Sequence, residues 1–199
     1  MNRKALLLIT LLVEGGLFVF GLLWMGGLDA MRSRFSLSWS ATGFVLLLCL
    51  PLLITLLFSV RTRWKPLSHL VREMEERVLP IFSSCTYFDL AFIAFFAGLG
   101  EELFFRGWLQ GVLAVKFGIW FGILMASALF GLAHYLSTTY AIYAFLTGLY
   151  LGVIYQVSGN LYIVMAIHAV YDFTALVYLI RRAKSRNMGM EPSRVADRK

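Results

Sequence analysis

Hydrophobic residues in this chain form long continuous runs instead of alternating with polar residues. A helical run must cross roughly 30 Å of hydrocarbon to span a bilayer. Because lipid cannot satisfy backbone groups and the runs do not alternate, helices are favoured over a barrel. The pattern predicts an all-α, polytopic membrane helical bundle with about six transmembrane helices, at residues 5–27, 41–60, 88–113, 117–136, 139–157 and 161–180.

The segment between the second and third runs, residues 61–86, is rich in charge, but its apolar residues recur at helical spacing. This pattern is typical of an amphipathic helix on the membrane surface. The segment is either a connector at the interface or a gate over an active site. The apolar residues that define the spacing are Leu67, Leu70, Val71, Met74 and Val78.

Three parts of the chain are therefore expected. Residues 1–86 hold two transmembrane helices and the interfacial amphipathic helix, and residues 87–180 hold the core. Residues 181–199 form a basic tail without an apolar period. We expect this tail to be disordered and attracted to anionic headgroups.

Composition supports an integral membrane protein, since 60% of residues are hydrophobic and 15% are charged. The net charge of +7 would suit a nucleic-acid partner, but the basic residues flank the apolar runs. We therefore expect the lipid bilayer, and no nucleic acid, as the partner. In a six-span arrangement only Arg32, Arg34 and Lys116 lie opposite the side that carries the termini. The positive-inside rule then predicts that both termini are cytoplasmic.

Ionisable residues interrupt the third run at Glu101, Glu102 and Arg106. Each costs about 2.5–3.5 kcal/mol to insert into a bilayer, so such groups usually mark a site or pathway. On a helix, Glu102 and Arg106 share a face, whereas Glu101 is rotated by about 100°. Arg106 can therefore hold Glu102 ionised and leave Glu101 as a general base. An ion-paired cluster that only locks helices together explains this motif equally well.

Two later runs carry the remaining ionisable candidates. His134 follows Phe130 by four residues, and Asp172 follows His168 by four. Side chains at this spacing share a helix face. His168 and Asp172 can bind a metal, orient water or donate to an oxyanion. The alternative is simple hydrogen bonding within or between helices.

Three further features bear on this assignment. Asp89, at the start of the third run, is explained by a helix N-terminal charge, whereas Glu14, inside the first run, either pairs with a neighbouring helix or lines the cavity.

Glu101 lies about 20 Å along its run and His134 about 25 Å along the next, antiparallel run, so the two residues are expected at different heights in the membrane. A shifted third span, tilt, or a break near Gly98 and Gly100 would bring them level.

Taken together, E-E-x-x-x-R, F-x-x-x-H and H-x-x-x-D occur in this order on three apolar helices, across roughly residues 88–177. At these residues the chain resembles the CPBP family of intramembrane proteases, which includes the CAAX prenyl protease 2 enzymes and the bacterial abortive-infection proteins. The resemblance implies an endopeptidase in the cell membrane of a prokaryote, acting on a membrane-associated peptide or protein. It also implies that Glu101 activates water, that His134 shares this water, and that His168 and residue 172 stabilise the oxyanion.

The family has been described both as zinc proteases and as metal-independent glutamic proteases. No H-E-x-x-H motif is present, yet Glu101, His134 and His168 are possible ligands for a divalent metal such as zinc. The prenyl protease branch has Asn where this chain has Asp172, and an ionised Asp cannot donate a hydrogen bond. This departure weakens the CAAX-substrate assignment more than the protease assignment.

Two functions of other classes remain open. An ion- or proton-coupled carrier could use the same ionisable groups, although paired broken helices in two matching halves are not evident. A non-catalytic immunity or binding protein could keep the fold, although all motif residues are present.

Overall fold

The computed structural model describes residues 2–189, and within them every regular element is a helix. Four helices are long and apolar enough to cross a membrane, or up to five if one bent pair counts as a single span. The predicted all-α bundle is therefore confirmed, and these numbers agree roughly with about six spans. The elements are α1 (Arg3–Trp24), α2 (Gly27–Ser33), α3 (Trp39–Ser59), α4 (Lys65–Glu73), η1 (Met74–Val78), η2 (Leu79–Phe82), α5 (Tyr87–Glu102), η3 (Leu103–Gln110), α6 (Gly111–Phe117), α7 (Ile119–Ala133), α8 (Thr138–Ser158) and α9 (Leu161–Gly189).

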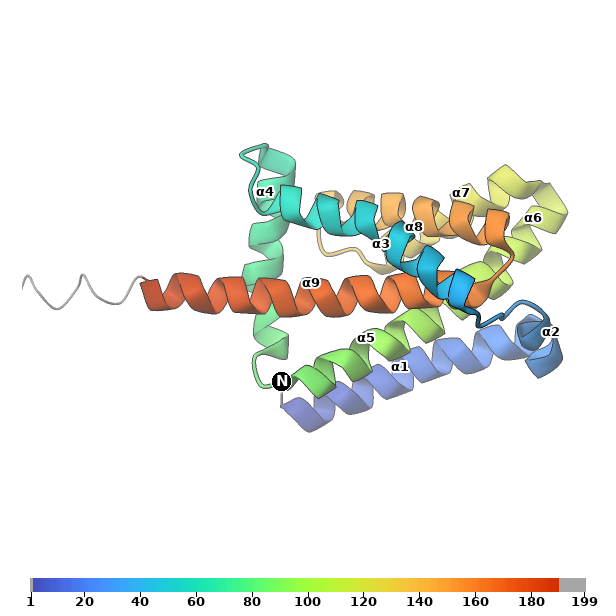
Figure 1. Ribbon diagram of the computed structural model, residues 1–199, viewed down its shortest axis with the longest axis horizontal. Coiled ribbons are helices and arrows are strands. Elements are labelled where there is room, and N and C mark those ends of the chain that lie inside the picture. The colour runs from blue at the N-terminus through green and yellow to red at the C-terminus, as the bar shows by residue number, and fades with distance from the viewer. Residues whose placement is uncertain (1, 190–199) are drawn as a thin grey trace, which may run out of the picture.

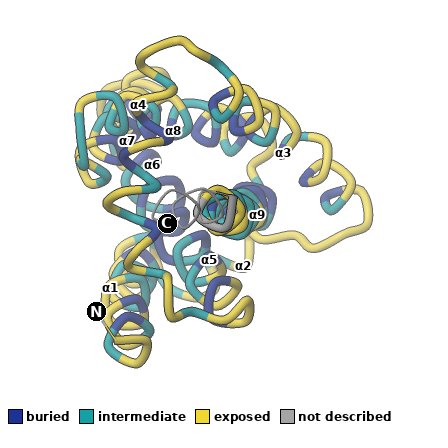
Figure 2. The backbone as a smooth tube through the Cα atoms, turned by 90° about the vertical axis from the view of Figure 1, so that its left-hand side faces the viewer, coloured by how far each residue is buried: buried dark blue, intermediate teal, exposed yellow. Residues whose placement is uncertain are grey.

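Helix α9 is the central element of the bundle. It packs mainly against α5 and α3, while α1 packs against α5 and α7 against α8. In the view along the bundle, α9 lies between the α1–α5 pair and the group formed by α3, α7 and α8 (Figure 2). The three helices that carry the sequence motifs are thereby brought together.

The N-terminus of α5 is fixed by a capping box. The Thr86 hydroxyl accepts from the Asp89 amide, and the Asp89 carboxylate accepts from the Thr86 amide. Arg3 of α1 donates to both Asp89 oxygens, at 2.7 and 2.9 Å. Asp89 is thus a helix N-terminal charge, as the sequence indicated, and it also ties α1 to α5.

The height difference expected between Glu101 and His134 is not found. Helix α6 continues the third apolar segment to Phe117, beyond the end predicted at residue 113, and the chain reverses at Gly118, whose φ is +97°. Glu101 and His134 then lie at nearly equal sequence distances before and after the turn. The expectation was wrong because it placed the turn too early, and α5 runs without a break through Gly98 and Gly100.

Within residues 61–86, where an amphipathic helix was expected, residues 65–82 form α4, η1 and η2. This segment is bent by 110° against residues 87–117 and crosses the bundle near the end that carries the N-terminus (Figure 1). Leu70, Val71 and Leu79 are buried. Its position at a membrane surface stays a prediction. We call residues 65–82 the crossing segment.

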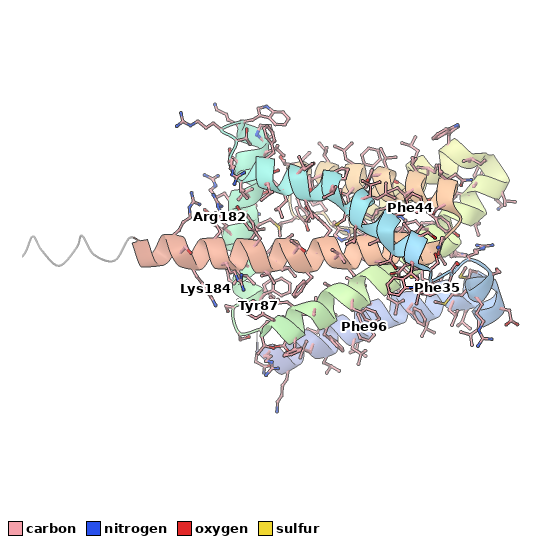
Figure 3. The ribbon with its side chains drawn as sticks, viewed as in Figure 1. Phe35, Phe44, Tyr87, Phe96, Arg182 and Lys184 are labelled. Atoms are coloured by element: carbon pink, nitrogen blue, oxygen red, sulfur yellow. The ribbon has the colours of Figure 1, made fainter. Side chains whose placement is uncertain are left out.

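The chain beyond Ile180 differs from the disordered tail that was expected. Helix α9 continues to Gly189, while residues 190–199 lie outside the described residues. Arg182 and Arg186 both pair with Glu75 of the crossing segment, and Arg182 lies where α9 passes that segment (Figure 3). These contacts give the additional turns of α9 a partner that the sequence alone did not reveal.

Candidate active site

Glu102 accepts hydrogen bonds from two elements of the bundle. Its Oε1 lies 2.8 Å from Nη1 of Arg106 and 2.8 Å from Nδ1 of His168 on α9. All three residues are buried. The predicted pairing of Glu102 with Arg106 is therefore present, and the same carboxylate also fixes the His168 ring.

The helix changes its winding directly after this carboxylate. Leu103–Gln110 form a π-helix, η3, a rare arrangement that often occurs at functional sites. From it, Arg106 donates to the Gly148 carbonyl at 3.1 Å and Gln110 to the Gly152 carbonyl at 3.1 Å. A Cβ at Gly148 would lie only 3.2 Å from the Ser127 Cβ on α7, so α8 packs closely against α7 at this glycine.

Glu101 faces two imidazoles. Its Oε2 lies 3.5 Å from Nε2 of His134, at the end of α7, and 3.9 Å from Nε2 of His168. These separations are too long for direct hydrogen bonds, and Oε2 is buried without a hydrogen-bond partner. A buried carboxylate oxygen requires a hydrogen-bond donor, and the described side chains supply none to this atom. Residues from α5, α7 and α9 thus converge on one point.

The orientation of His134 follows from Phe130, one turn earlier. The His134 ring stacks on the Phe130 ring with centroids 4.4 Å apart, and Nδ1 lies 2.9 Å from the Phe130 carbonyl oxygen. A carbonyl can only accept, so Nδ1 carries the hydrogen and Nε2 of the neutral ring is an acceptor facing Glu101. The Phe130 ring also lies 4.6 Å from the Arg106 guanidinium.

Asp172 completes the group on α9. Its Oδ2 lies 3.3 Å from Nε2 of His168, and about a third of its side chain is exposed. His168 therefore has carboxylates at both ring nitrogens, Glu102 at Nδ1 and Asp172 at Nε2. The two carboxylates together restrict the orientation of the ring.

A cavity of about 220 Å³ opens beside these groups. His134, His168 and Asp172 line it together with mostly apolar side chains. Sequence reasoning missed its tyrosines, Tyr140 and Tyr143 on α8 and Tyr171 on α9, although Tyr140, Tyr143 and Thr147 recur at helical spacing. The crossing segment covers part of the cavity through Leu70, Val71, Met74, Val78 and Phe82.

That Glu101, His134 and His168 hold a metal stays a prediction. Within residues 2–189, no group of three His, Cys, Asp or Glu side chains is placed to hold a metal ion. We therefore derive no chemical step through a metal.

Comparison with protein families gives one finding. Residues 83–174 match the model of the Rce1-like family, described as type II CAAX prenyl endopeptidase Rce1-like. The match begins just before α5 and contains all three sequence motifs. Comparisons with curated proteins and with solved structures gave no match. The family match confirms the resemblance predicted from the motifs.

Proposed function

Because residues 83–174 match the Rce1-like family model, we propose that the chain is an intramembrane endopeptidase of the CPBP family. It hydrolyses a peptide bond of a membrane-associated protein or peptide. The observation that carries the proposal is the convergence of Glu101, His134 and His168 beside one cavity.

In the proposed reaction, a water molecule binds between Oε2 of Glu101 and Nε2 of His134. Glu101 takes one proton as the water oxygen bonds to the peptide carbonyl carbon. The proton then passes from Glu101 to the amine nitrogen as the C–N bond breaks. The buried and unpartnered state of Glu101 Oε2 supports this role.

His168 is the proposed oxyanion donor. Its Nδ1 is fixed by Glu102, and its Nε2 is held only loosely by Asp172, at 3.3 Å. The Nε2–H group can therefore also donate to a tetrahedral oxyanion. Asp172 orients the ring, a role that an ionised Asp can fill.

Glu102 and Arg106 position the other groups and do not touch the substrate. Arg106 neutralises Glu102 and is itself held by the Gly148 carbonyl and the Phe130 ring. This network fixes His168 and Phe130, and Phe130 fixes His134. Pre-organised donors of this kind lose little free energy to reorganisation during the reaction.

The cavity lining supports a substrate that presents an apolar group beside its scissile bond. CAAX-type processing is the finer proposal, and the family match supports it. Asp172, where the prenyl protease branch has Asn, argues for testing unprenylated substrates as well.

The proposed orientation puts both termini in the cytoplasm of a prokaryotic cell, with the bundle in the cell membrane. The N-terminus of α1, the C-terminal end of α9 and the crossing segment share one end of the bundle (Figure 1). Together with Arg61 and Arg63, which precede the crossing segment, these segments hold 11 of the 18 Lys and Arg residues, which supports the assignment by the positive-inside rule.

The test is cleavage by purified protein in proteoliposomes, with prenylated and unprenylated membrane peptides analysed by mass spectrometry. Glu101→Ala and His134→Ala should each abolish cleavage, whereas the exposed Glu76→Ala should not. Cleavage that persists unchanged in both site variants would refute the mechanism. Ion flux without peptide hydrolysis would favour the carrier, and substrate binding without turnover would favour the immunity or binding protein.

A further inference from the structure

A second cavity, of about 620 Å³, lies outside the proposed active site, where the crossing segment meets α8. Helix α4 lies beside α8 here (Figure 2). The proposed reaction uses none of the side chains that line this cavity, and we call it the basic pocket. Its lining residues are Lys65, Pro66, Ser68, His69 and Arg72 of α4 and Thr139 of α8.

The basic side chains of the pocket share one face of α4. Lys65, His69 and Arg72 follow one another at intervals of four and three residues, and side chains at these intervals lie on the same side of a helix. The opposite face carries Leu70 and Val71, which are buried. Helix α4 therefore packs on the bundle through its apolar face and presents its basic face to the pocket.

The positive charge of the pocket is not neutralised within it. None of the described residues that line it is acidic. At its rim, His69 lies 3.5 Å from Glu73, and Arg72 lies 3.8 Å from Glu76. The Arg72–Glu76 pair is weak, because its side chains are 63% and 65% exposed. A pocket of this kind attracts an anion.

The first turn of α8 adds hydrogen-bond donors. Thr139 is the second residue of this helix, which begins at Thr138. The Ser137 hydroxyl accepts from the Tyr140 amide, whereas the amides of Thr138 and Thr139 precede the first residue that can find an acceptor inside the helix. Such a helix end carries partial positive charge and favours phosphate groups. The Thr139 hydroxyl is a further donor.

The location of the pocket indicates where its anion comes from. Helix α3, which ends at Ser59 shortly before the pocket, and α8, which begins at Thr138, are both candidate membrane spans. Trp64, next to Lys65, is 62% exposed, and exposed tryptophans are typical of the membrane–water interface. A pocket between the ends of two spans lies at the level of the lipid headgroups.

We propose that the basic pocket binds the phosphate of an anionic phospholipid headgroup. Lys65 and Arg72 pair with the phosphate oxygens, and the first turn of α8 donates to them. The bound headgroup links α4 to α8 and so holds the crossing segment beside the active-site cavity. This proposal does not depend on the proposed proteolysis.

Native mass spectrometry of the purified full-length protein measures the binding of phosphatidylglycerol, with phosphatidylcholine for comparison. At an ionic strength of about 0.15 M, exposed charges more than about 8 Å away are largely screened. Lys65→Gln/Arg72→Gln should weaken phosphatidylglycerol binding by about 10-fold or more. Arg61→Gln/Arg63→Gln removes the same charge from the preceding loop, outside the pocket, and should change binding by less than about 2-fold.

A second pair of variants tests the shape of the pocket without changing its charge. Thr139→Phe narrows the pocket and should weaken phosphatidylglycerol binding, whereas Thr138→Phe, at an exposed neighbouring position, should not. Equal losses in the pocket and loop variants would overturn the proposal, because general surface attraction would then explain the binding. Equal affinity for phosphatidylcholine would also overturn it, as would displacement of the lipid by inorganic phosphate or by a hexaglutamate peptide.

Discussion

Two clusters of charge in this protein use the same residue types in opposite surroundings. Arg106 and Glu102 pair at 2.8 Å with side chains that are 1% and 0% exposed. Arg182 pairs with Glu75 where the two side chains are 21% and 17% exposed, and Arg186, also paired with Glu75, is 56% exposed. Only the inner cluster is closed to water.

The difference in burial gives the two clusters different effects on stability. A buried pair that loses one partner leaves a charge without solvent, whereas an exposed pair is replaced by water at little cost. The inner cluster therefore fixes the geometry of the site. The outer cluster holds the crossing segment against α9, a contact that can open and close at modest cost.

The largest expected effect is on the inner cluster. Arg106→Ala should lower the free energy of unfolding by about 3–5 kcal/mol, because Glu102 is left buried and unpaired. Thermal unfolding in detergent measures this change. The double variant Glu102→Leu/Arg106→Met should be more stable than Arg106→Ala, since it buries no charge. If Arg106→Ala unfolds at the same temperature as the wild type, the buried cluster is no more important for stability than the exposed one, and the account is contradicted.

Glu73, on the crossing segment, should show an intermediate effect. It is buried, accepts from the Ser137 hydroxyl, and lies 3.5 Å from His69 and 3.7 Å from Arg77. Glu73→Ala should cost about 1–3 kcal/mol of local stability, because the Ser137 contact to the loop after His134 is lost.

Opening of the crossing segment can be measured with a thiol probe. In a background with Cys49 and Cys85 replaced by Ala, Met74→Cys should react faster with a thiol reagent when Glu73 is also replaced. Exposed Glu76→Ala is the matched control and should leave the labelling rate unchanged. Equal rates with and without Glu73 would contradict the gate interpretation, which stays a prediction.

The outer cluster should have a smaller effect on stability than Glu73. Glu75→Ala should change the free energy of unfolding by about 1 kcal/mol or less, and added salt should reduce the difference. Unfolding at low and high ionic strength measures it. A loss as large as that of Arg106→Ala would show that the two clusters do not differ in the way that their exposure indicates.

No effect is expected from metal removal. The proposed reaction includes no step through a metal ion, so a chelator should leave the cleavage rate unchanged. Elemental analysis of active protein should show less than one equivalent of zinc. Loss of cleavage with the chelator, restored by zinc, would contradict the metal-independent reaction.

Spacing along single helices was enough to predict the local part of the site. The four-residue intervals of Glu102 with Arg106, Phe130 with His134, and His168 with Asp172 all appear as contacts. Such contacts depend only on helical geometry, which the apolar runs already indicated.

Relations between helices could not be predicted in the same way. The level of Glu101 and His134 depends on the length of α6 and the turn at Gly118, because one misplaced boundary shifts every residue after it. Contacts of Glu75 with α9 and of Glu14 with α5 link residues far apart in the sequence. Apolar periodicity carries no information about such pairings.

A double-mutant cycle on kcat tests the central claim that Glu101 and His134 act on the same water. Single-turnover cleavage is compared for the wild type, Glu101→Gln, His134→Ala and the double variant. The double variant should be no slower than Glu101→Gln alone, because residues that act as one unit lose their effect together. Rate losses that multiply in the double variant would show that the two side chains act on separate events.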